Sequence, residues 1–247
     1  MYQFFVEPSQ IQGTRVVITG SDVNHIKNVL RMKVGEELAV SNGSDGKEYR
    51  CGIEAFLDGE VLCTLRFIKE DAVELPSKIS LFQGLPKGDK MELIIQKAVE
   101  LGVYEIIPVV AGRSVVRLDE KRAQNKLARW QEIARAAAKQ SKRALIPKVQ
   151  QIMKMEEAVV YAEAMDVKLI PYELAEDMAQ TRELISRIKP GESIAVFIGP
   201  EGGFEEKEVK AAIERGITPI TMGRRILRTE TAGPAVLAWL MYHLEEA

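Results

Sequence analysis

Short alternations of apolar and polar residues, broken by turn signals, run through the first seventy positions of this chain. Such alternation is typical of strands with one buried face, and the runs predict strands at residues 2–6, 15–19, 37–41, 47–56 and 60–68. Pairs such as Asn42-Gly43 favour tight reversals between antiparallel neighbours, because both residue types tolerate positive φ. One helix is expected, capped by Ser21 or Asp22. The segment is therefore predicted to be a small, mostly β module.

The pattern changes at residue 79, where apolar runs begin to alternate with longer amphipathic stretches. This order is typical of βα units stacked into a mainly parallel sheet. Strands are expected at residues 79–83, 105–109, 167–171, 193–198 and 218–222. Helices are expected at residues 90–101, 121–141, 155–164, 179–188, 205–215 and 232–244. We therefore expect an α/β fold with two domains, 1–72 and 73–247, joined by a polar linker at 70–76.

The last predicted helix, at residues 232–244, is apolar almost all round. One face of a sheet cannot cover such a helix, so more protein must pack against it. Burial in the core and burial against a second subunit both account for this pattern. We favour the subunit interface.

The net charge of -2 conceals an uneven distribution of charge along the chain. Between residues 112 and 148 there are eleven Lys or Arg residues against three acidic ones, so one basic segment stands in an otherwise acidic protein. Charges on the outer face of a helix are often only solvated. The competing interpretation is a face that binds a polyanion.

The sequence predicts a protein that stays in the cytoplasm and has no membrane partner. The longest apolar run, 234–244, is too short for a membrane span, and the chain opens into a strand-like stretch without a signal peptide. Cys51 and Cys63 are the two cysteines, and they form no CxxC pair. They are expected to be buried free thiols, and neither a disulfide nor a metal site is expected.

The segment Phe197-Ile-Gly-Pro-Glu-Gly-Gly-Phe204 joins a buried strand to a helix through a glycine-rich turn. Ligands bind at the carboxyl ends of strands in open α/β sheets, and glycines let backbone groups approach a ligand closely. An ordinary tight turn needs fewer glycines, so we favour a binding loop. The spacing is not the GxGxxG of dinucleotide sites, and the chain contains no GxxxxGK[ST] phosphate loop.

A second segment, Thr221 to Ala232, again leaves a strand through a glycine and enters a helix. It carries Arg224, Arg225 and Arg228 next to the positive end of a helix dipole, where arginines are unfavourable unless an anion or a carboxylate faces them. Capping of the helix would explain the Thr-Glu-Thr sequence that follows, but not the arginines. The segment therefore favours a site for a phosphate or for a developing oxyanion.

Together, the segment 197–204 and the sequence Leu-Arg-Thr-Glu-Thr-Ala at 227–232 resemble the two cofactor loops of the RsmE-type methyltransferases, in the SPOUT superfamily. The resemblance extends to His-Ile-Lys-Asn-Val-Leu-Arg at 25–31 and to the segment 90–102, and so covers nearly the whole chain. Each piece alone is weak, but the combination is highly specific.

The resemblance implies a PUA-like β-barrel that binds RNA, followed by a SPOUT domain with a C-terminal trefoil knot, in a homodimer. It also implies methylation of N3 of a uridine in 16S ribosomal RNA of the small subunit, with S-adenosyl-L-methionine as the methyl donor. The residues that would bind this cofactor are Phe197, Ile198, Gly199, Pro200, Glu201, Gly202, Met222, Gly223, Ile226, Leu227, Arg228, Thr231 and Ala232.

Methyl transfer to N3 improves if the N3 proton leaves and the charge that spreads onto O2 and O4 meets a cation. Arg228 is the first candidate for that contact, and Glu201 is a second polar group expected near the base or the cofactor. No residue stands out as the general base. The residues expected to contact RNA are His25, Arg31, Lys33, Lys139, Gln140 and Arg143.

Three other functions remain open at this point. The protein could be a SPOUT methyltransferase for another RNA position, or an RNA-binding protein that keeps the fold without catalysis. Titration with S-adenosylmethionine separates these two, because the silent protein would not bind the cofactor. A nucleotide-dependent oxidoreductase is a remote third possibility, and it would require affinity for NAD or FAD.

Overall fold

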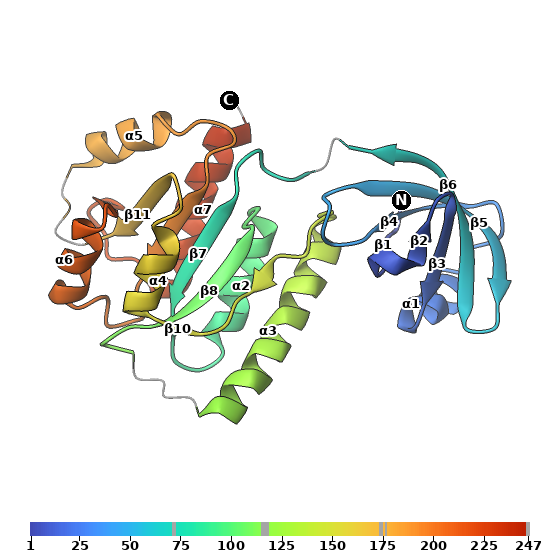
Figure 1. The fold of residues 1–247 in the computed structure, drawn as a ribbon, viewed down its shortest axis with the longest axis horizontal. Helices are drawn as coiled ribbons and strands as arrows, with labels where there is room; N and C mark the ends of the chain where they lie inside the picture. Colours follow the sequence, from blue (N-terminus) through green and yellow to red (C-terminus); the bar gives the residue numbers. More distant parts are fainter. Residues whose placement is uncertain (71–72, 115–118, 173–174, 176, 246–247) are drawn as a thin grey trace. The chain divides into compact units, whose positions relative to one another are not determined.

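A computed structural model describes residues 1–70, 73–114, 119–172, 175 and 177–245 (Figure 1). The chain divides into two compact units. The first comprises Met1–Glu74 together with Ala138–Ile146, and the second comprises Leu75–Ala137 and Pro147–Ala247. The segment 138–146 was expected in the second domain, but it belongs to the first unit. The physical reason is long-range hydrogen bonding, which a linear reading of the chain cannot show.

The first unit is a six-stranded sheet around one apolar core, with strand order β1-β4-β5-β6-β3-β2. The strands are β1 Gln3–Phe5, β2 Ile11–Gln12, β3 Arg15–Thr19, β4 Glu37–Ser41, β5 Glu48–Leu57 and β6 Glu60–Lys69. All pairs are antiparallel except β1 and β4, which run parallel, contrary to the expected arrangement. No tight turn connects β1 to β4, so the connection leaves their relative direction free.

Helical turns occupy two connections of the first unit. A 3₁₀ turn, η1, covers Pro8–Gln10, and α1 at Ser21–Asn24 continues into a π-helical segment, η2, at His25–Val29. The helix expected near residue 21 is thus confirmed. Its N-cap is Gly20, at φ +75°, and neither Ser21 nor Asp22 provides the cap.

The second unit is built on a parallel sheet, as the alternation of strands and helices predicted. Its order is β10-β8-β7-β12-β11-β13, with β9 also paired to β8. The strands are β7 Ile79–Gly84, β8 Glu105–Val110, β9 Lys148–Val149, β10 Met153–Lys154, β11 Val167–Pro171, β12 Ile194–Ile198 and β13 Thr218–Ile220. The five predicted strands are all present. The two-residue strands β9 and β10 were missed, because they are too short to show a period.

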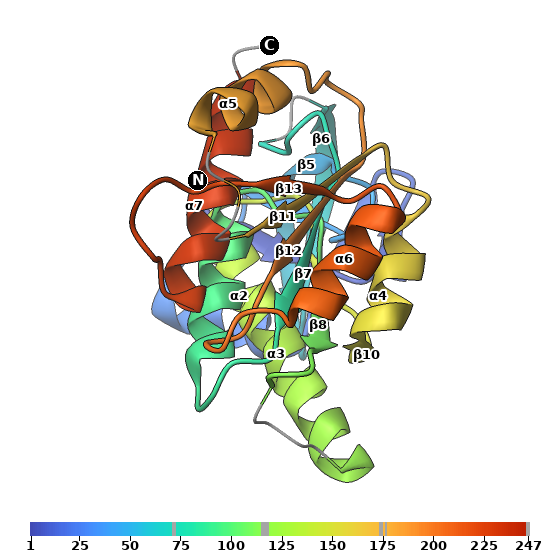
Figure 2. The same ribbon diagram turned by 90° about the vertical axis from the view of Figure 1, so that its left-hand side faces the viewer.

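The helices of the second unit lie on both faces of this sheet. They are α2 Lys90–Glu100, α3 Glu120–Gln140, α4 Met155–Ala162, α5 Met178–Ser186, α6 Glu206–Glu214 and α7 Thr229–Glu245, and α3 enters the first unit at Ala138. Figure 2 shows α4 and α6 on one face and α2 and α7 on the other. Helix α7 begins three residues before the predicted start. The N–H groups of Thr231 and Ala232 already donate to the carbonyl of Arg228.

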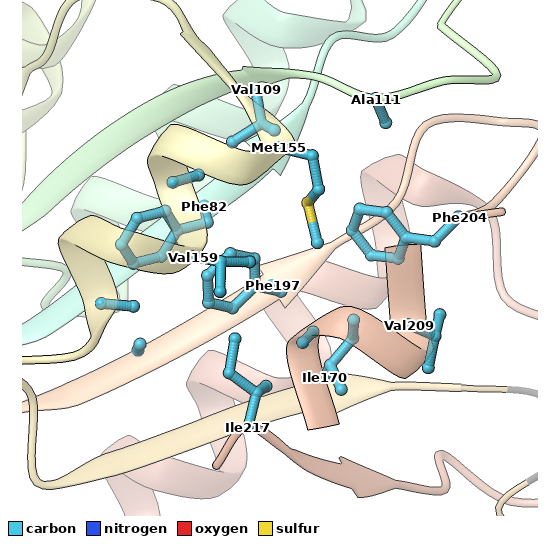
Figure 3. Packing of buried hydrophobic residues seen from close by; sticks show 14 of the residues in the cluster. Phe82, Val109, Ala111, Met155, Val159, Ile170, Phe197, Phe204, Val209 and Ile217 are labelled. Carbon is cyan, nitrogen blue, oxygen red and sulfur yellow. The ribbon is translucent and has the colours of Figure 1, made fainter. Parts of the chain in front are cut away.

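Stacked phenylalanines lie in the core between the sheet and the helices α4 and α6 (Figure 3). The rings of Phe82 on β7 and Phe197 on β12 are 4.3 Å apart and nearly parallel, and both are fully buried. Val159 of α4 and Val209 of α6 belong to the same cluster. The stacked rings lie side by side because Phe82 and Phe197 are partners in the parallel pairing of β7 with β12.

Candidate functional site

Several loops that follow the parallel strands line one cavity of about 1030 Å³ in the second unit. The first loop follows β12 and the second follows β13. The lining residues are Lys90, Arg113, 171–172, Ala175, Met178, 198–204, 221–230 and Ala232. The two glycine-bearing segments singled out in the sequence therefore meet in space, although β11 lies between their strands in the sheet.

The predicted cofactor residues sort into two groups. Those that line the cavity are Ile198, Gly199, Pro200, Glu201, Gly202, Met222, Gly223, Ile226, Leu227, Arg228 and Ala232. Phe197 and Thr231 do not line it. The side chain of Phe197 packs in the core against Phe82, because alternate residues of a strand face opposite sides of the sheet. Thr231 is exposed on the first turn of α7.

The first loop packs directly against the end of β7. A Cβ atom added to Gly84 would lie 2.6 Å from the backbone nitrogen of Pro200 and 2.9 Å from the carbonyl carbon of Gly199. Within the loop, the N–H of Gly203 donates to the carbonyl of Pro200 at 2.9 Å, and Gly203 has a positive φ of 68°. Only a glycine at position 84 leaves space for this turn.

A buried hydrogen-bond chain connects the first loop to the start of α7. The amide Nε2 of Gln83 donates to the hydroxyl of Thr229 at 2.9 Å, and that hydroxyl donates to the carbonyl of Gly199 at 2.6 Å. Gln83 is fully buried and Thr229 is 5% exposed, so water does not compete for these bonds. Sequence reasoning missed Gln83. The available signal was a polar residue at the end of an apolar strand.

Lys90 places one cation beside two carboxylates of the cavity. Its Nζ lies 2.9 Å from Glu201 Oε1 and 3.6 Å from Glu230 Oε2. Glu201 also accepts the backbone N–H of Lys87 at 3.1 Å. The Glu201 carboxylate raises the pKa of Lys90. Sequence reasoning did not assign Lys90 a role, although it opens the helix that follows β7.

The environment of Glu201 favours its charged form. Burial alone would raise the pKa of Glu201, but hydrogen bonds from Lys90 and from backbone N–H groups lower it below its usual value. The contact with Lys90 is therefore formed at neutral pH and is lost as the pH falls through the lowered pKa. Glu201 is thus an anchor of the first loop, and its oxygens are already engaged by the protein.

The second loop presents positive charge and one apolar side chain at the cavity. Arg224, Arg225 and Arg228 are exposed and have no hydrogen-bond or ion-pair partner among the described residues. Ile226 lies among them and is 94% exposed. The arginines also stand next to the N-terminus of α7, where the helix dipole adds positive potential. The rim of the cavity is therefore suited to an anion.

The six predicted RNA contacts all fall in the first unit. His25 packs edge-on against the ring of Phe4 at 6.3 Å, and the ammonium of Lys139 lies 5.0 Å from the centre of the same ring. Lys139 also pairs with Asp22 at 2.7 Å. Exposed positions are occupied by Arg31, Lys33 and Gln140. Five of the six side chains thus remain at the surface.

Arg143 is the exception, and its predicted contact with RNA is wrong. The side chain is buried and pairs with Glu74, which also accepts the backbone N–H groups of Ala144 and Leu145 at 3.0 and 3.1 Å. A guanidinium in this position cannot reach a phosphate. The pair instead fixes the segment 138–146 within the first unit.

We expect Glu74→Ala to lower the free energy of unfolding by about 3–5 kcal/mol, because it leaves the charge of Arg143 buried without a partner. Chemical denaturation monitored by circular dichroism measures the change. Glu70→Ala is the matched control, since Glu70 pairs with Lys47 at the surface and such pairs contribute little. Equal stability of the two variants would contradict a structural role for the buried pair.

The remaining predictions from composition concern thiols, metals and membranes. Cys51 and Cys63 are buried free thiols, and burial raises their pKa values to about 11 and about 12. Within the described part of the chain, no group of three or more His, Cys, Asp or Glu side chains could hold a metal ion. In the same residues, no helix has the length and apolarity needed to cross a bilayer.

Comparison with known proteins finds a matching family model in each of the two units. The family model described as RNA methyltransferase domain matches residues 73–241, and the one described as RNA methyltransferase PUA domain matches residues 18–65. Ribosomal RNA small subunit methyltransferase E of Bacillus subtilis is 36% identical over 99% of this chain and 98% of its own length. The enzyme of the same name from Synechocystis is 30% identical over 99% of this chain and 78% of its own.

Solved structures agree with these matches. Ribosomal RNA small subunit methyltransferase E from Neisseria gonorrhoeae, bound to S-adenosylmethionine, has a TM-score of 0.82 and 32% identity, covering 98% of this chain and 97% of that one. A methyltransferase from Legionella pneumophila, also in complex with this cofactor, has a TM-score of 0.81 and 32% identity, covering 97% and 96%. The resemblance inferred from the two loops is confirmed, and the chain belongs to the RNA methyltransferase family of the RsmE type, in the SPOUT superfamily.

Proposed function

We propose that this protein transfers a methyl group from S-adenosyl-L-methionine to N3 of a uridine in 16S ribosomal RNA of the small subunit. The observation that carries the proposal is the convergence of the two glycine-bearing loops on one cavity beside unpaired arginines. The relatives of the same family with bound cofactor support it. The threading of the second loop as a trefoil knot, inferred from the resemblance, is part of the proposal.

The residues of the cavity fit the cofactor. Its volume of about 1030 Å³ is at the upper end of small-molecule sites, which leaves room for a nucleoside and a target base. Gly199, Gly202 and Gly223 line the cavity without a side chain that would fill the space, and Ile198, Met222 and Leu227 offer apolar surface. When bound, the sulfonium supplies an electrophilic methyl group. The protein then contributes mainly by holding N3 in line with it.

Arg228 is the residue proposed to contact the reacting base. Loss of the N3 proton spreads negative charge onto O2 and O4 of the uracil, and a guanidinium stabilises this charge in a site that excludes water. The backbone carbonyl of Arg228 accepts the first N–H bonds of α7, so its main chain is fixed. Its side chain is exposed toward the cavity and unpaired within the described chain.

RNA recognition is assigned to the surface residues of the first unit and to the basic helix α3. His25, Arg31, Lys33, Lys139 and Gln140 are the proposed contacts, and Arg143 is removed from the set. Phosphate contacts from such residues release counterions, so binding should weaken steeply as salt rises. The proposed substrate is the RNA within the assembled small subunit, and the proposed site of action is the cytoplasm.

The homodimer is proposed to use the outer face of α7. Trp239 and Met241 of this helix are only half-buried, and Tyr242 is 65% exposed. We expect Trp239→Glu to give a monomer, because the new carboxylate would lose its water in an apolar interface. Sedimentation velocity measures the mass. A native protein that sediments as a monomer would remove the dimer from the proposal.

One assay tests the activity directly. Small subunits that lack the modification are incubated with the protein and labelled S-adenosylmethionine, and the methylated base is mapped by mass spectrometry. A product methylated at uridine N3 supports the proposal. A methyl group at another position would identify a different RNA methyltransferase of the superfamily. Absence of cofactor binding by calorimetry would identify a silent RNA-binding protein.

A further inference from the structure

The described residues that line the cavity include two carboxylates, and they are in different chemical states. Glu201 has its oxygens engaged by Lys90 and by the backbone N–H of Lys87. These donors stabilise the charged form and hold the pKa of Glu201 below its usual value, which makes this carboxylate a weaker base. Glu201 is therefore not suited to remove a proton from the substrate.

Glu230 shares the ion pair with Lys90 but lacks these hydrogen bonds. Neither of its oxygens accepts a hydrogen bond from the described part of the chain, and Oε2 is shielded from solvent without a hydrogen-bond partner. Lys90, which it shares with Glu201, lies 3.6 Å from Oε2, beyond hydrogen-bond distance. Buried acceptors nearly always accept a hydrogen bond, so one that lacks a hydrogen bond beside a cavity, with only the ion pair to Lys90, is suited to accept one from a bound ligand.

Helix capping does not explain this carboxylate. In the first turn of α7, the N–H groups of Thr231 and Ala232 donate to the carbonyl of Arg228 at 2.8 and 2.9 Å, and no backbone N–H donates to the side chain of Glu230 among the described residues. The hydroxyl of Thr229 is engaged with Gln83 and Gly199. The side chain of Glu230 is 19% exposed, and the residue lines the cavity.

Glu230 and Arg228 together match the edge of one nucleobase. Uracil presents an N3–H donor between two carbonyl acceptors. A carboxylate accepts from N3–H while a guanidinium two residues away donates to a carbonyl oxygen. Cytosine carries a lone pair at N3, which would face the carboxylate and be repelled. The pair therefore favours an imide base.

We infer that Glu230 accepts the N3 proton of the target uridine and so acts as the general base of the reaction, an inference that rests on the proposed methyl transfer. The N3–H bond breaks and its proton passes to the carboxylate of Glu230. The N3 electron pair forms the bond to the methyl carbon as the bond from carbon to sulfur breaks, and that pair stays on sulfur. The proton leaves Glu230 for water after the products depart.

The other titratable groups near the cavity do not take this role. Lys90 carries a raised pKa and is protonated at neutral pH, and the guanidinium groups of the second loop are donors without an acceptor site for a proton. Tyr172 lines the cavity, but a phenol is a weak base before it ionises. The ring of His243, near the far end of α7, is hydrogen-bonded to the carbonyl of Ile188.

The test compares Glu230→Gln with the native protein on small subunits reconstituted with unmodified RNA. We expect kcat to fall roughly 100-fold or more, the usual contribution of a positioned base, while the affinity for S-adenosylmethionine by calorimetry is unchanged. Glu245→Gln, in the last turn of the same helix, is the matched control, and should behave as native.

A second substrate separates proton removal from mere positioning. Fluorine at C5 of uracil makes N3–H more acidic, so the rate of methylation of RNA made with 5-fluorouridine should depend less on a general base. The deficit of Glu230→Gln should shrink roughly tenfold on this RNA. The inference is overturned if the variant keeps native kcat, or if its deficit is equal on both RNAs. If the native protein methylates neither RNA at N3, the proposed function itself fails.

Discussion

Replacement of Arg228 by alanine is expected to lower kcat for RNA methylation roughly 100- to 1000-fold, the usual effect of removing a donor that stabilises a developing oxyanion. Affinity for S-adenosylmethionine should change little. The carbonyl of Arg228 accepts the N–H groups of Thr231 and Ala232 in the first turn of α7. Alanine keeps these backbone hydrogen bonds and removes only the exposed guanidinium. Single-turnover rates and calorimetry on the same preparation measure the two quantities.

Two control variants sharpen this experiment. Arg228→Lys keeps the charge but loses the planar donor pair, so it should recover part of the rate. Arg224→Ala removes a neighbouring guanidinium of the same loop and should act mainly on RNA affinity and its salt dependence. Native turnover in Arg228→Ala would exclude the side chain from the mechanism. Equal losses in the Arg224 and Arg228 variants would indicate a shared electrostatic role only.

The second large effect is expected from Gly84→Ala, which should abolish or strongly weaken cofactor binding. The new methyl group would lie 2.5 Å from Cδ and 2.6 Å from the backbone nitrogen of Pro200, and a backbone atom cannot move aside as a flexible side chain does. The first loop would have to move away from β7, and the backbone that lines the cavity would move with it, so the affinity for the cofactor should fall. Calorimetric titration with S-adenosylmethionine measures the loss.

Gly233→Ala is the matched control for this substitution. Its added methyl group would meet Gln83 Oε1 at 3.6 Å, an ordinary contact, within α7. Alanine favours a helix over glycine, so the variant should be more stable by up to about 1 kcal/mol and should bind the cofactor as the native protein does. Native affinity in Gly84→Ala would show that the first loop can relax around the methyl group.

Much of this architecture could be predicted from local sequence patterns. The five main strands of the second unit follow from apolar runs such as 79–83 and 193–198, because a buried parallel strand needs apolar residues on both faces. The binding loops were recognisable because glycine permits close backbone approach wherever it stands. The basic character of the second loop was equally visible in Arg224, Arg225 and Arg228.

Other features depend on partners that are distant in the chain. Arg143 belongs to a basic segment and was assigned to RNA, but Glu74, sixty-nine residues away, pairs with it in the interior. Phe197 is the first residue of the glycine-rich motif, but side chains alternate between the two faces of β12, and the ring of Phe197 faces Phe82 in the core. Neither contact can be predicted from neighbouring residues, because in each case the partner is distant in the sequence and comes close only in the folded chain.

The sequence by itself determined the element types, the two loops and the family, because periodicity, glycine and motif spacing are local properties of a chain. The tertiary structure alone decided which charges are available for chemistry. It engages Glu201 with Lys90 and leaves Glu230 without a hydrogen bond, although both are glutamates next to glycine-bearing loops. The reason is that the state of a charge depends on the donors around it in space, and the donors to Glu201 come from Lys87 and Lys90, at and just before the start of α2, far from Glu201 in the chain.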